Sequence, residues 1–402
     1  MNAPAAPLAD LDPSNPTLHA EDTWRPVFKR LRAEAPVHYT ADTELFGSFW
    51  SVTRYEDIRY VDTHHDLFSS ETGIVIGDQA EDFELPMFIA MDPPKHDEQR
   101  KVVSPVVAPM NLKKMESTIR ARACAILDGL PRGETFNWVE RVSIELTTQM
   151  LATLFDFPFE DRRRLTRWSD VATARPGMGI VETEEQRREE LYECLACFTD
   201  LWNQRVNAPP GNDLISMLAH GEATQNMSPQ EYLGNLLLLI VGGNDTTRNS
   251  ISGGVLAFNR FPDELAKLRA NPKLLPGAVS EIIRWQTPLA HMRRRATQDI
   301  EMHGQTIRKG DKVVMWYVSG NRDEDFWERP DDLMIERSNA RAHLAFGFGI
   351  HRCMGNRLAE MQLRIVWEEI LRRFETVEVV DEPVRVLSNF VRGYSELPVR
   401  VT

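Results

Sequence analysis

The stretch AFGFGIHRCMG, residues 345–355, decides the fold of this chain. Three glycines surround Cys353, and the apolar spacing over 356–374 predicts a helix directly afterwards. At a helix N-terminus, unpaired N–H groups and the helix dipole stabilise a thiolate, and glycines let a large flat group approach the backbone. A sulfur ligand to a metal cofactor fits these features better than a buried structural cysteine or a nucleophile. The spacing excludes a G-x-G-x-x-G dinucleotide loop.

A second unusual segment lies in the longest helix that the sequence predicts. Residues 228–231, Ser-Pro-Gln-Glu, form a capping-box pattern, and apolar residues continue to about Phe261, before Pro262. A helix of this length spans about 50 Å. Its centre, GGNDTT at 242–247, sets glycines and polar groups among buried positions, which costs stability. Either the helix opens onto a cavity there or the segment is a loop.

Composition and patterning favour a mainly α fold with small β-sheets. Helical patterns occupy 95–285 and 356–374, and strand-like patterns lie near 36–54, 299–316 and 377–401. We expect one large domain over 1–402, with 1–20 as a loosely ordered N-terminal arm.

The net charge of −13 argues against nucleic acid as a partner. No signal peptide and no membrane-length apolar run are evident, so we expect a cytoplasmic protein that does not bind membranes.

The other cysteines do not suggest a disulfide framework or a second metal site. Cys194 and Cys197 form a CxxC pair within an amphipathic helix pattern, without a second CxxC or a histidine pair. We interpret this pair as structural.

Residues 346–355 resemble the haem-binding signature of the cytochrome P-450 superfamily, the haem-thiolate monooxygenases. The fixed aromatic, glycine, cysteine and final glycine of that signature correspond to Phe346, Gly349, Cys353 and Gly355. The resemblance implies haem b as cofactor and Cys353 as the ligand of its iron. It also implies the P-450 fold, with haem between the long central helix and the helix after Cys353.

Further motifs of the same family follow in the expected order. Glu281 and Arg284 resemble the E-x-x-R motif, whose family partner corresponds to Arg337, and this trio is expected to be structural. Gly242 and the residues after it resemble the oxygen-binding groove, which implies contact of Thr246 with dioxygen and a proton relay through Asp245.

Four residues match the family's partners of the haem propionates. His96 and Arg100 are spaced i, i+4 and therefore share a helix face, where charge-assisted bonds to carboxylates can form. The other two are Arg294 and His351. Because 293–295 are three arginines in a row, the register at Arg294 needs a structure to fix it.

Within this family, the amino-acid sequence most resembles the soluble bacterial alkane and fatty-acid terminal (omega) hydroxylases. Residues 241–258, 315–327 and 343–362 carry this likeness. It implies hydroxylation at the terminal carbon of medium-chain alkanes or fatty acids; the alternative is another small apolar substrate, a terpene or other secondary metabolite. Candidate substrate-channel walls are Ile74, Val75, Ile76, Leu239, Ile240, Leu289, Ala290, Met292 and Phe390, each of which is otherwise ordinary core.

Electrons must come from outside, because the sequence has no flavin or iron–sulfur motif. The resemblance implies a ferredoxin and a ferredoxin reductase that draws on NAD(P)H. Residues 337–357 contain Arg337, Arg341, Arg352 and Arg357 and no acidic residue, which predicts a basic docking face for an acidic ferredoxin.

Two alternatives share the scaffold. A peroxide-driven enzyme tends to lack the acid–alcohol pair, which Asp245 and Thr246 retain here. A haem or gas sensor would need an output domain, for which the matched region leaves no spare segment. Oxygen uptake coupled to product formation separates both alternatives from a monooxygenase.

Overall fold

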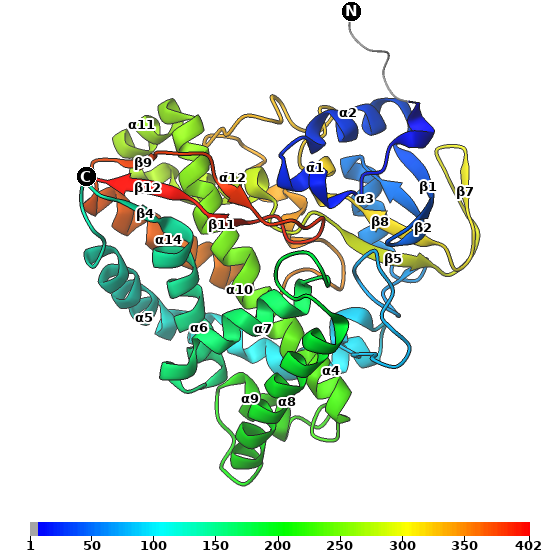
Figure 1. Ribbon diagram of the computed structural model, residues 1–402, viewed down its shortest axis with the longest axis horizontal. Helices are drawn as coiled ribbons and strands as arrows, with labels where there is room; N and C mark the ends of the chain where they lie inside the picture. The colour runs from blue at the N-terminus through cyan, green and yellow to red at the C-terminus, as the bar shows by residue number, and fades with distance from the viewer. Residues whose placement is uncertain (1–6) are drawn as a thin grey trace, which may run out of the picture.

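The computed structural model describes residues 7–402, and helices form most of it (Figure 1). The α-helices of this part are α1 Pro16–Ala20, α2 Trp24–Glu34, α3 Tyr55–Thr63, α4 Lys95–Val103, α5 Pro109–Asp128, α6 Glu145–Phe155, α7 Arg163–Thr173, α8 Glu184–Val206, α9 Leu214–His220, α10 Pro229–Arg260, α11 Pro262–Ala270, α12 Leu275–Gln286, α13 Tyr317–Gly320 and α14 Asn356–Arg373. Short helical turns are η1 Leu8–Asp10, η2 Phe88–Ala90, η3 Ser104–Val107, η4 Val139–Ile144, η5 Phe159–Asp161, η6 Pro272–Leu274, η7 Ala340–Ala342 and η8 Leu344–Phe346. The predicted mainly α class is confirmed.

The largest sheet has the order β1-β2-β8-β5-β3 and lies on the right in Figure 1. Its strands are β1 Val37–Thr43, β2 Gly47–Val52, β8 Lys312–Met315, β5 Met292–Ala296 and β3 Phe68–Ser69. Strand β2 runs parallel to β8, and the other pairs are antiparallel. The smaller sheets use β4 Thr135–Asn137, β12 Pro398–Val401 and β9 Val377–Val379; β6 Ile300–Met302 and β7 Gln305–Ile307; and β10 Val384–Arg385 and β11 Tyr394–Glu396. The three strand regions predicted from the sequence are present, while β3, β4 and β5 were not predicted.

Helix α10 crosses the centre of the molecule and continues through 242–247, so the loop interpretation of that segment is wrong (Figure 1). Its 32 residues begin where the Ser228 hydroxyl accepts a hydrogen bond from the Glu231 N–H at 3.2 Å. The Glu231 carboxylate does not close the capping box. It pairs with Lys95 at 2.8 Å and accepts from the Gln99 amide at 2.6 Å, so it ties α10 to α4.

The N-terminal arm expected over 1–20 lies partly outside the described residues, which begin at residue 7. From there, η1 and α1 form, and Ser14 and His19 are buried. The His19 ring stacks on Trp316, with centroids 6.0 Å apart. This part therefore packs on the body of the protein, which corrects the expectation of a loose arm for it.

The CxxC pair lies on α8, where Cys194 is fully buried in the main core and Cys197 is half-buried. Among residues 7–402, no cluster of His, Cys, Asp and Glu side chains is arranged to hold a metal ion. The geometry agrees with a structural interpretation of the pair. In the same described range, no helix combines the length and apolar character needed to cross a membrane.

Candidate functional site

Cys353 lies just before α14, where the sequence predicted a helix N-terminus. Its N–H donates to the Phe346 carbonyl at 2.8 Å, which closes the loop. The Cys353 residue is exposed, but the protein atoms packed around its sulfur desolvate the thiol and raise its pKa, while the N–H groups of Gly355 and Asn356 and the cation of Arg100 oppose that rise. The same surroundings would stabilise a thiolate bound to a metal.

Two glycines of this loop are required by its geometry. Gly347 and Gly349 have φ of +65° and +66°, a region that favours glycine. A Cβ on Gly349 would stand 2.4 Å from the backbone oxygen of Asp62, so the loop packs directly on α3. At Gly355 and Gly242, in contrast, a Cβ would meet no protein atom within 4 Å. These last two glycines leave space beside the backbone.

Asp62 links the cysteine loop to the large sheet, and no sequence motif pointed to it. Its buried carboxylate accepts from Arg294 at 2.9 Å, from the Phe348 N–H at 2.6 Å and from the Tyr317 hydroxyl at 3.1 Å. Burial raises the pKa of Asp62, and the Arg294 cation acts in the other direction. A single carboxylate thus fixes α3, β5 and the loop relative to one another.

The arginine run 293–295 alternates across β5, as side chains in a strand must. Arg293 and Arg295 both reach Asp78, at 2.5 and 3.3 Å. Arg294 points to the opposite side, toward Asp62, and its charge lowers the pKa of His351. The structure therefore places the predicted residue of the three, Arg294, next to the cysteine loop.

His96, Arg100 and His351 gather beside Cys353. The rings of His96 and His351 lie 4.3 Å apart between centroids. The Nε2 of His96 and both ring nitrogens of His351 are buried without a hydrogen-bond partner in the described residues. Burial, followed by the Arg294 charge, lowers the pKa of His351 to about 2.

These observations fit haem. A cysteine thiol at a helix N-terminus, two glycines that leave open space, and buried imidazole nitrogens without partners beside arginines match a flat metal-bearing group with two carboxylates. Cys353 would bind the iron, and His96, Arg100, Arg294 and His351 would hold the carboxylates.

Asp245 lies fully buried in the middle of α10. Burial, opposed by the nearby Arg248, raises the pKa of Asp245 to about 6. Its Oδ1 lies 3.0 Å from Arg248 Nη2 and accepts from Asn244 at 3.1 Å, while its Oδ2 has no partner within residues 7–402. Arg248 also pairs with Asp170 at 2.6 Å. The spacing of Asp245 and Arg248 was a signal that the sequence analysis missed.

Thr246 adjoins Asp245 and is only half-buried. Its hydroxyl donates to the Gly242 carbonyl at 3.0 Å, and this leaves the oxygen lone pairs free to accept. Asp245 and Thr246 therefore lie within one turn of Gly242, where α10 leaves space beside its backbone.

The E-x-x-R trio is assembled and buried. Arg284 donates to both oxygens of Glu281, at 2.7 and 2.8 Å, and to three backbone carbonyls. Arg337 donates to Glu281 at 3.1 Å. The carboxylate also accepts from the Met334 N–H at 2.9 Å, which joins α12 to the segment before the cysteine loop.

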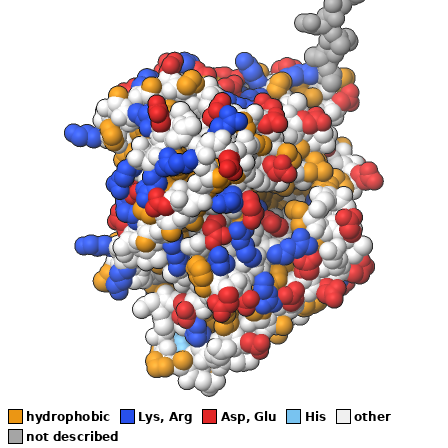
Figure 2. Space-filling model, turned by 60° about the vertical axis from the view of Figure 1, so that its left-hand side comes forward, with side chains coloured by type: hydrophobic (Ala, Val, Ile, Leu, Met, Phe, Trp, Pro, Cys, Tyr) orange, Lys and Arg blue, Asp and Glu red, His pale blue; other side chains and the backbone are white. Residues whose placement is uncertain are grey.

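The geometry of Arg337 corrects one prediction. Its side chain is only 4% exposed, so it is not part of the basic docking face. Arg341, Arg352 and Arg357 are exposed, and all three act on the pKa of Glu360, which burial raises. These three arginines around Glu360 are called the basic face below. Elsewhere, acidic and basic side chains are interspersed, as Figure 2 shows for one side of the molecule.

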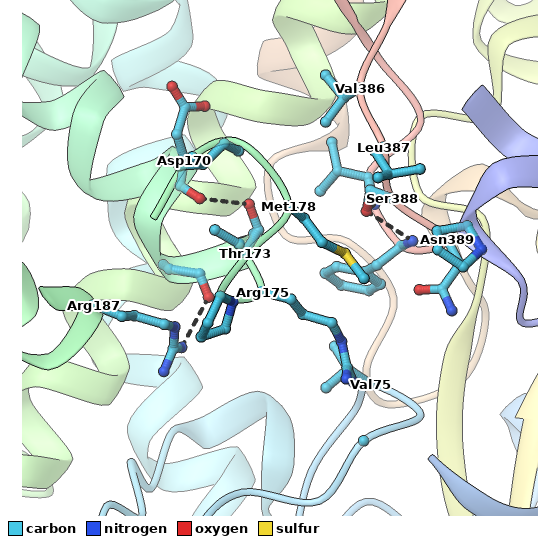
Figure 3. A pocket seen from close by; sticks show the side chains of 18 of the residues that line it. Val75, Asp170, Thr173, Arg175, Met178, Arg187, Val386, Leu387, Ser388 and Asn389 are labelled. Carbon is cyan, nitrogen blue, oxygen red and sulfur yellow. Dashed lines mark hydrogen bonds between the residues drawn. The ribbon is translucent and has the colours of Figure 1, made fainter. Parts of the chain in front are cut away.

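A cavity of about 900 Å³ lies between residues 75–85, the segment from the end of α7 to α8, and residues 385–395 (Figure 3). Three of the predicted substrate residues, Val75, Ile76 and Phe390, line it. Arg248 and Asp170 line it as well, so the cavity reaches α10 one helical turn beyond Asp245. The segment 172–180, which supplies one wall, was missed because its sequence has no distinctive pattern.

The other six predicted substrate residues do not line this cavity: Ile74, Leu239, Ile240, Leu289, Ala290 and Met292. Ile240 is fully buried within the core, on the inner face of α10. Ala290 is fully buried in the core cluster that contains Trp316, with its backbone bonded to Phe390 and Val318. Neither side chain lines the cavity.

Comparisons with known proteins agree with a haem site of this kind. A profile of the Cytochrome P450 family matches residues 180–393. The linalool 8-monooxygenase of Pseudomonas putida is 37% identical, over 96% of this chain and 98% of its own. The methyl-branched lipid omega-hydroxylase of Mycobacterium tuberculosis is 33% identical, over 98% of this chain and 96% of its own.

A solved structure, CYP153D17 from Sphingomonas sp. PAMC 26605, superimposes with a TM-score of 0.91. It is 50% identical and covers 97% of this chain and 98% of its own. Similarity at this level extends to the family's haem-thiolate chemistry as well as to the fold. The chain belongs to the cytochrome P450 family and is a haem-dependent monooxygenase.

Proposed function

We propose that this P450 hydroxylates the terminal carbon of medium-chain alkanes or fatty acids, with electrons from a ferredoxin and its reductase. The observation that carries the proposal is the match to a methyl-branched lipid omega-hydroxylase over 98% of the chain. The cavity supports it, since Phe46, Val75, Ile76, Phe83 and Leu85 supply apolar wall along one side.

Haem, bound through Cys353, would supply oxygen activation and the transfer of one oxygen atom to a C–H bond. The protein residues then have three tasks. His96, Arg100, Arg294 and His351 would hold the carboxylates of the cofactor, and the buried trio around Glu281 would keep the cysteine loop in place. Gly242 and Gly355 would leave room for the ring.

Proton supply is assigned to Asp245 and Thr246. The pKa of Asp245, about 6, allows its carboxyl to take up and release a proton near neutral pH. The proton would reside on Oδ2, which has no partner in the described chain. Arg248 pairs with Asp245 and with Asp170, whose side chain is 29% exposed, and so connects the buried acid with the solvent side.

Hydroxylation at a chain end is a problem of position, because internal C–H bonds are weaker than those of the terminal methyl. The substrate must therefore be held so that only its end reaches the reacting centre. We assign this task to Val75, Ile76 and Phe390, which line the cavity.

Electron supply comes from a separate redox partner, as in bacterial P450s. We propose an acidic ferredoxin, because the basic face of Arg341, Arg352 and Arg357 offers complementary charge.

A second candidate is a terpene hydroxylase. The match to linalool 8-monooxygenase, at 37% identity, favours it.

Product analysis decides between the two candidate functions. The haem-loaded enzyme is supplied with a ferredoxin, its reductase and NADH, and then with octane, decanoic acid or linalool in turn. Oxygen uptake matched by 1-octanol or 10-hydroxydecanoic acid supports the proposal. Oxidation of linalool alone would overturn it in favour of the terpene reading, and peroxide-only turnover would overturn both.

A further inference from the structure

The cavity contains four arginines, and three of them have carboxylate partners. Arg187 pairs with Glu184 at 3.1 Å, and Arg248 pairs with Asp170 at 2.6 Å. The third, Arg385, pairs with Asp22 at 3.4 Å. The fourth, Arg175, pairs with no Asp or Glu among residues 7–402, and its nearest protein acceptor is the Leu45 carbonyl at 3.4 Å.

The acids that line the cavity do not neutralise Arg175. Asp78 is occupied by Arg293 at 2.5 Å and by Lys312 at 2.6 Å. Asp170 and Glu184 belong to the pairs with Arg248 and Arg187. The cavity wall therefore carries one uncompensated positive charge.

Arg175 is held in a defined position. Its guanidinium lies 4.1 Å from the centroid of the Phe46 ring, a cation–π contact. The Arg175 guanidinium also lies over Gly77. A Cβ on Gly77 would come within 2.5 Å of Arg175 Nη2, so a larger residue at this position would displace the guanidinium. Figure 3 shows Arg175 extending from the segment after α7 across the cavity toward Val75.

Burial, together with the neighbouring Arg187, lowers the pKa of Arg175, which means that its charge is poorly solvated. A half-buried cation without a counter-ion is costly, and a ligand carboxylate would remove that cost. The neighbouring His291 adds no charge, because burial lowers its pKa to about 3. Its Nδ1 bonds with the Asn389 carbonyl at 3.0 Å and is therefore the protonated nitrogen.

We propose that Arg175 binds the carboxylate of a fatty acid, which makes the preferred substrate an amphiphile rather than an alkane. A guanidinium fork matches a carboxylate in geometry and charge. The apolar chain then lies along Val75, Ile76 and Phe390, and its methyl end is directed away from the fixed head group. This inference rests on the proposed function and names its substrate class.

The test compares ligands of one chain length on the purified, haem-loaded enzyme. The probes are decanoate and 1-decanol, and binding is read from the spin-state shift of the haem and from calorimetry. In Arg175→Gln we expect decanoate to bind about tenfold more weakly or worse, since a charge-assisted pair is lost. Binding of 1-decanol should change less than twofold. Arg175→Lys, which keeps the charge but not the fork, should lie between the two.

The matched control is Arg187→Gln, which removes an arginine of the same cavity that already has a carboxylate partner. It should leave the ratio of decanoate to decanol affinity unchanged. Equal weakening of both ligands in Arg175→Gln, or no weakening of decanoate, would overturn the inference. Failure of the proposed function looks different: decanoate then binds through Arg175, yet no product is hydroxylated at the chain end.

Discussion

At the scale of single residues, Asp245 gives the sharpest prediction. Asp245→Asn keeps the shape but cannot release a proton, so coupled product formation should fall roughly tenfold or more. Substrate affinity, read from the haem spin-state shift, should stay within about twofold, because Asp245 does not line the cavity. Unchanged turnover in Asp245→Asn would contradict the assigned role.

The pH dependence follows from the same residue. Because the pKa of Asp245 is raised from 3.8 to about 6, the folded protein favours the protonated carboxyl. The stability that this contributes is fully present below pH ~4 and is lost as the pH rises through about 6. Proton-limited turnover of the wild type should decline as the pH rises through about 6, and turnover of Asp245→Asn should not. Stopped-flow and steady-state rates between pH 5 and 8 check this.

Cys353 carries the cofactor assignment. The dithionite-reduced wild type under carbon monoxide should show a far-red Soret maximum, and Cys353→Ser should lose it because a serine hydroxyl does not supply a thiolate. Cys197→Ser is the matched control, since Cys197 is a half-buried cysteine on α8 and does not belong to the loop before α14. A retained far-red band in Cys353→Ser would refute the assignment.

Residues in motifs were predictable, and residues in loops were not. Cys353, Thr246 and Arg294 could be singled out from the sequence, because each lies in a regular element or shortly before one. Asp62 and Arg175 had no signal, since their contacts, with Arg294 and with Phe46, join segments far apart in the chain. Six of the predicted substrate residues, Ala290 among them, do not line the cavity, because apolarity alone does not distinguish a channel wall from core.

At the scale of elements, the buried trio joins α12 to the segment that leads into the cysteine loop. Glu281→Gln removes the charge that compensates Arg284 and Arg337, so the free energy of unfolding should fall by about 3–5 kcal/mol. Urea unfolding of the haem-loaded protein measures this. Glu378→Gln is the control. Glu378 forms an exposed ion pair with Arg400, with 3.8 Å between the charged atoms, and such a pair contributes less than about 1 kcal/mol to the free energy of unfolding. Equal losses in both variants would argue against a structural role of the trio.

Long elements were the most predictable part of the fold. The start of α10 at its Ser228 cap, and its end before Pro262, follow from local signals that need no tertiary information. The short strands β3, β4 and β5 were missed, because their pairing partners are distant in sequence and their own patterns are too brief to read. Only the structure could show that α10 stays helical across Gly242 and Gly243.

At the scale of the whole molecule, the net charge and the basic face act together. The chain carries a net charge of −13, so an acidic partner is repelled from most of the surface. The basic face of Arg341, Arg352 and Arg357, close to Cys353 in sequence, offers local positive charge to such a partner. Partner recognition should then depend on these few charges and should weaken as salt screens them.

Charge reversal tests this directly. Arg341→Glu or Arg357→Glu should slow ferredoxin-dependent reduction about tenfold at low ionic strength, because the encounter loses its electrostatic attraction. Stopped-flow reduction under carbon monoxide gives the rate, and the spin-state shift shows that substrate affinity is unchanged. Arg308→Glu is the matched control, since Arg308 is also a surface arginine, 67% exposed, but it follows β7 in the two-stranded β6–β7 sheet and is not part of the basic face. The difference between the variants and the wild type should shrink as salt is raised. Equal rates for all proteins at low salt would place the docking site elsewhere.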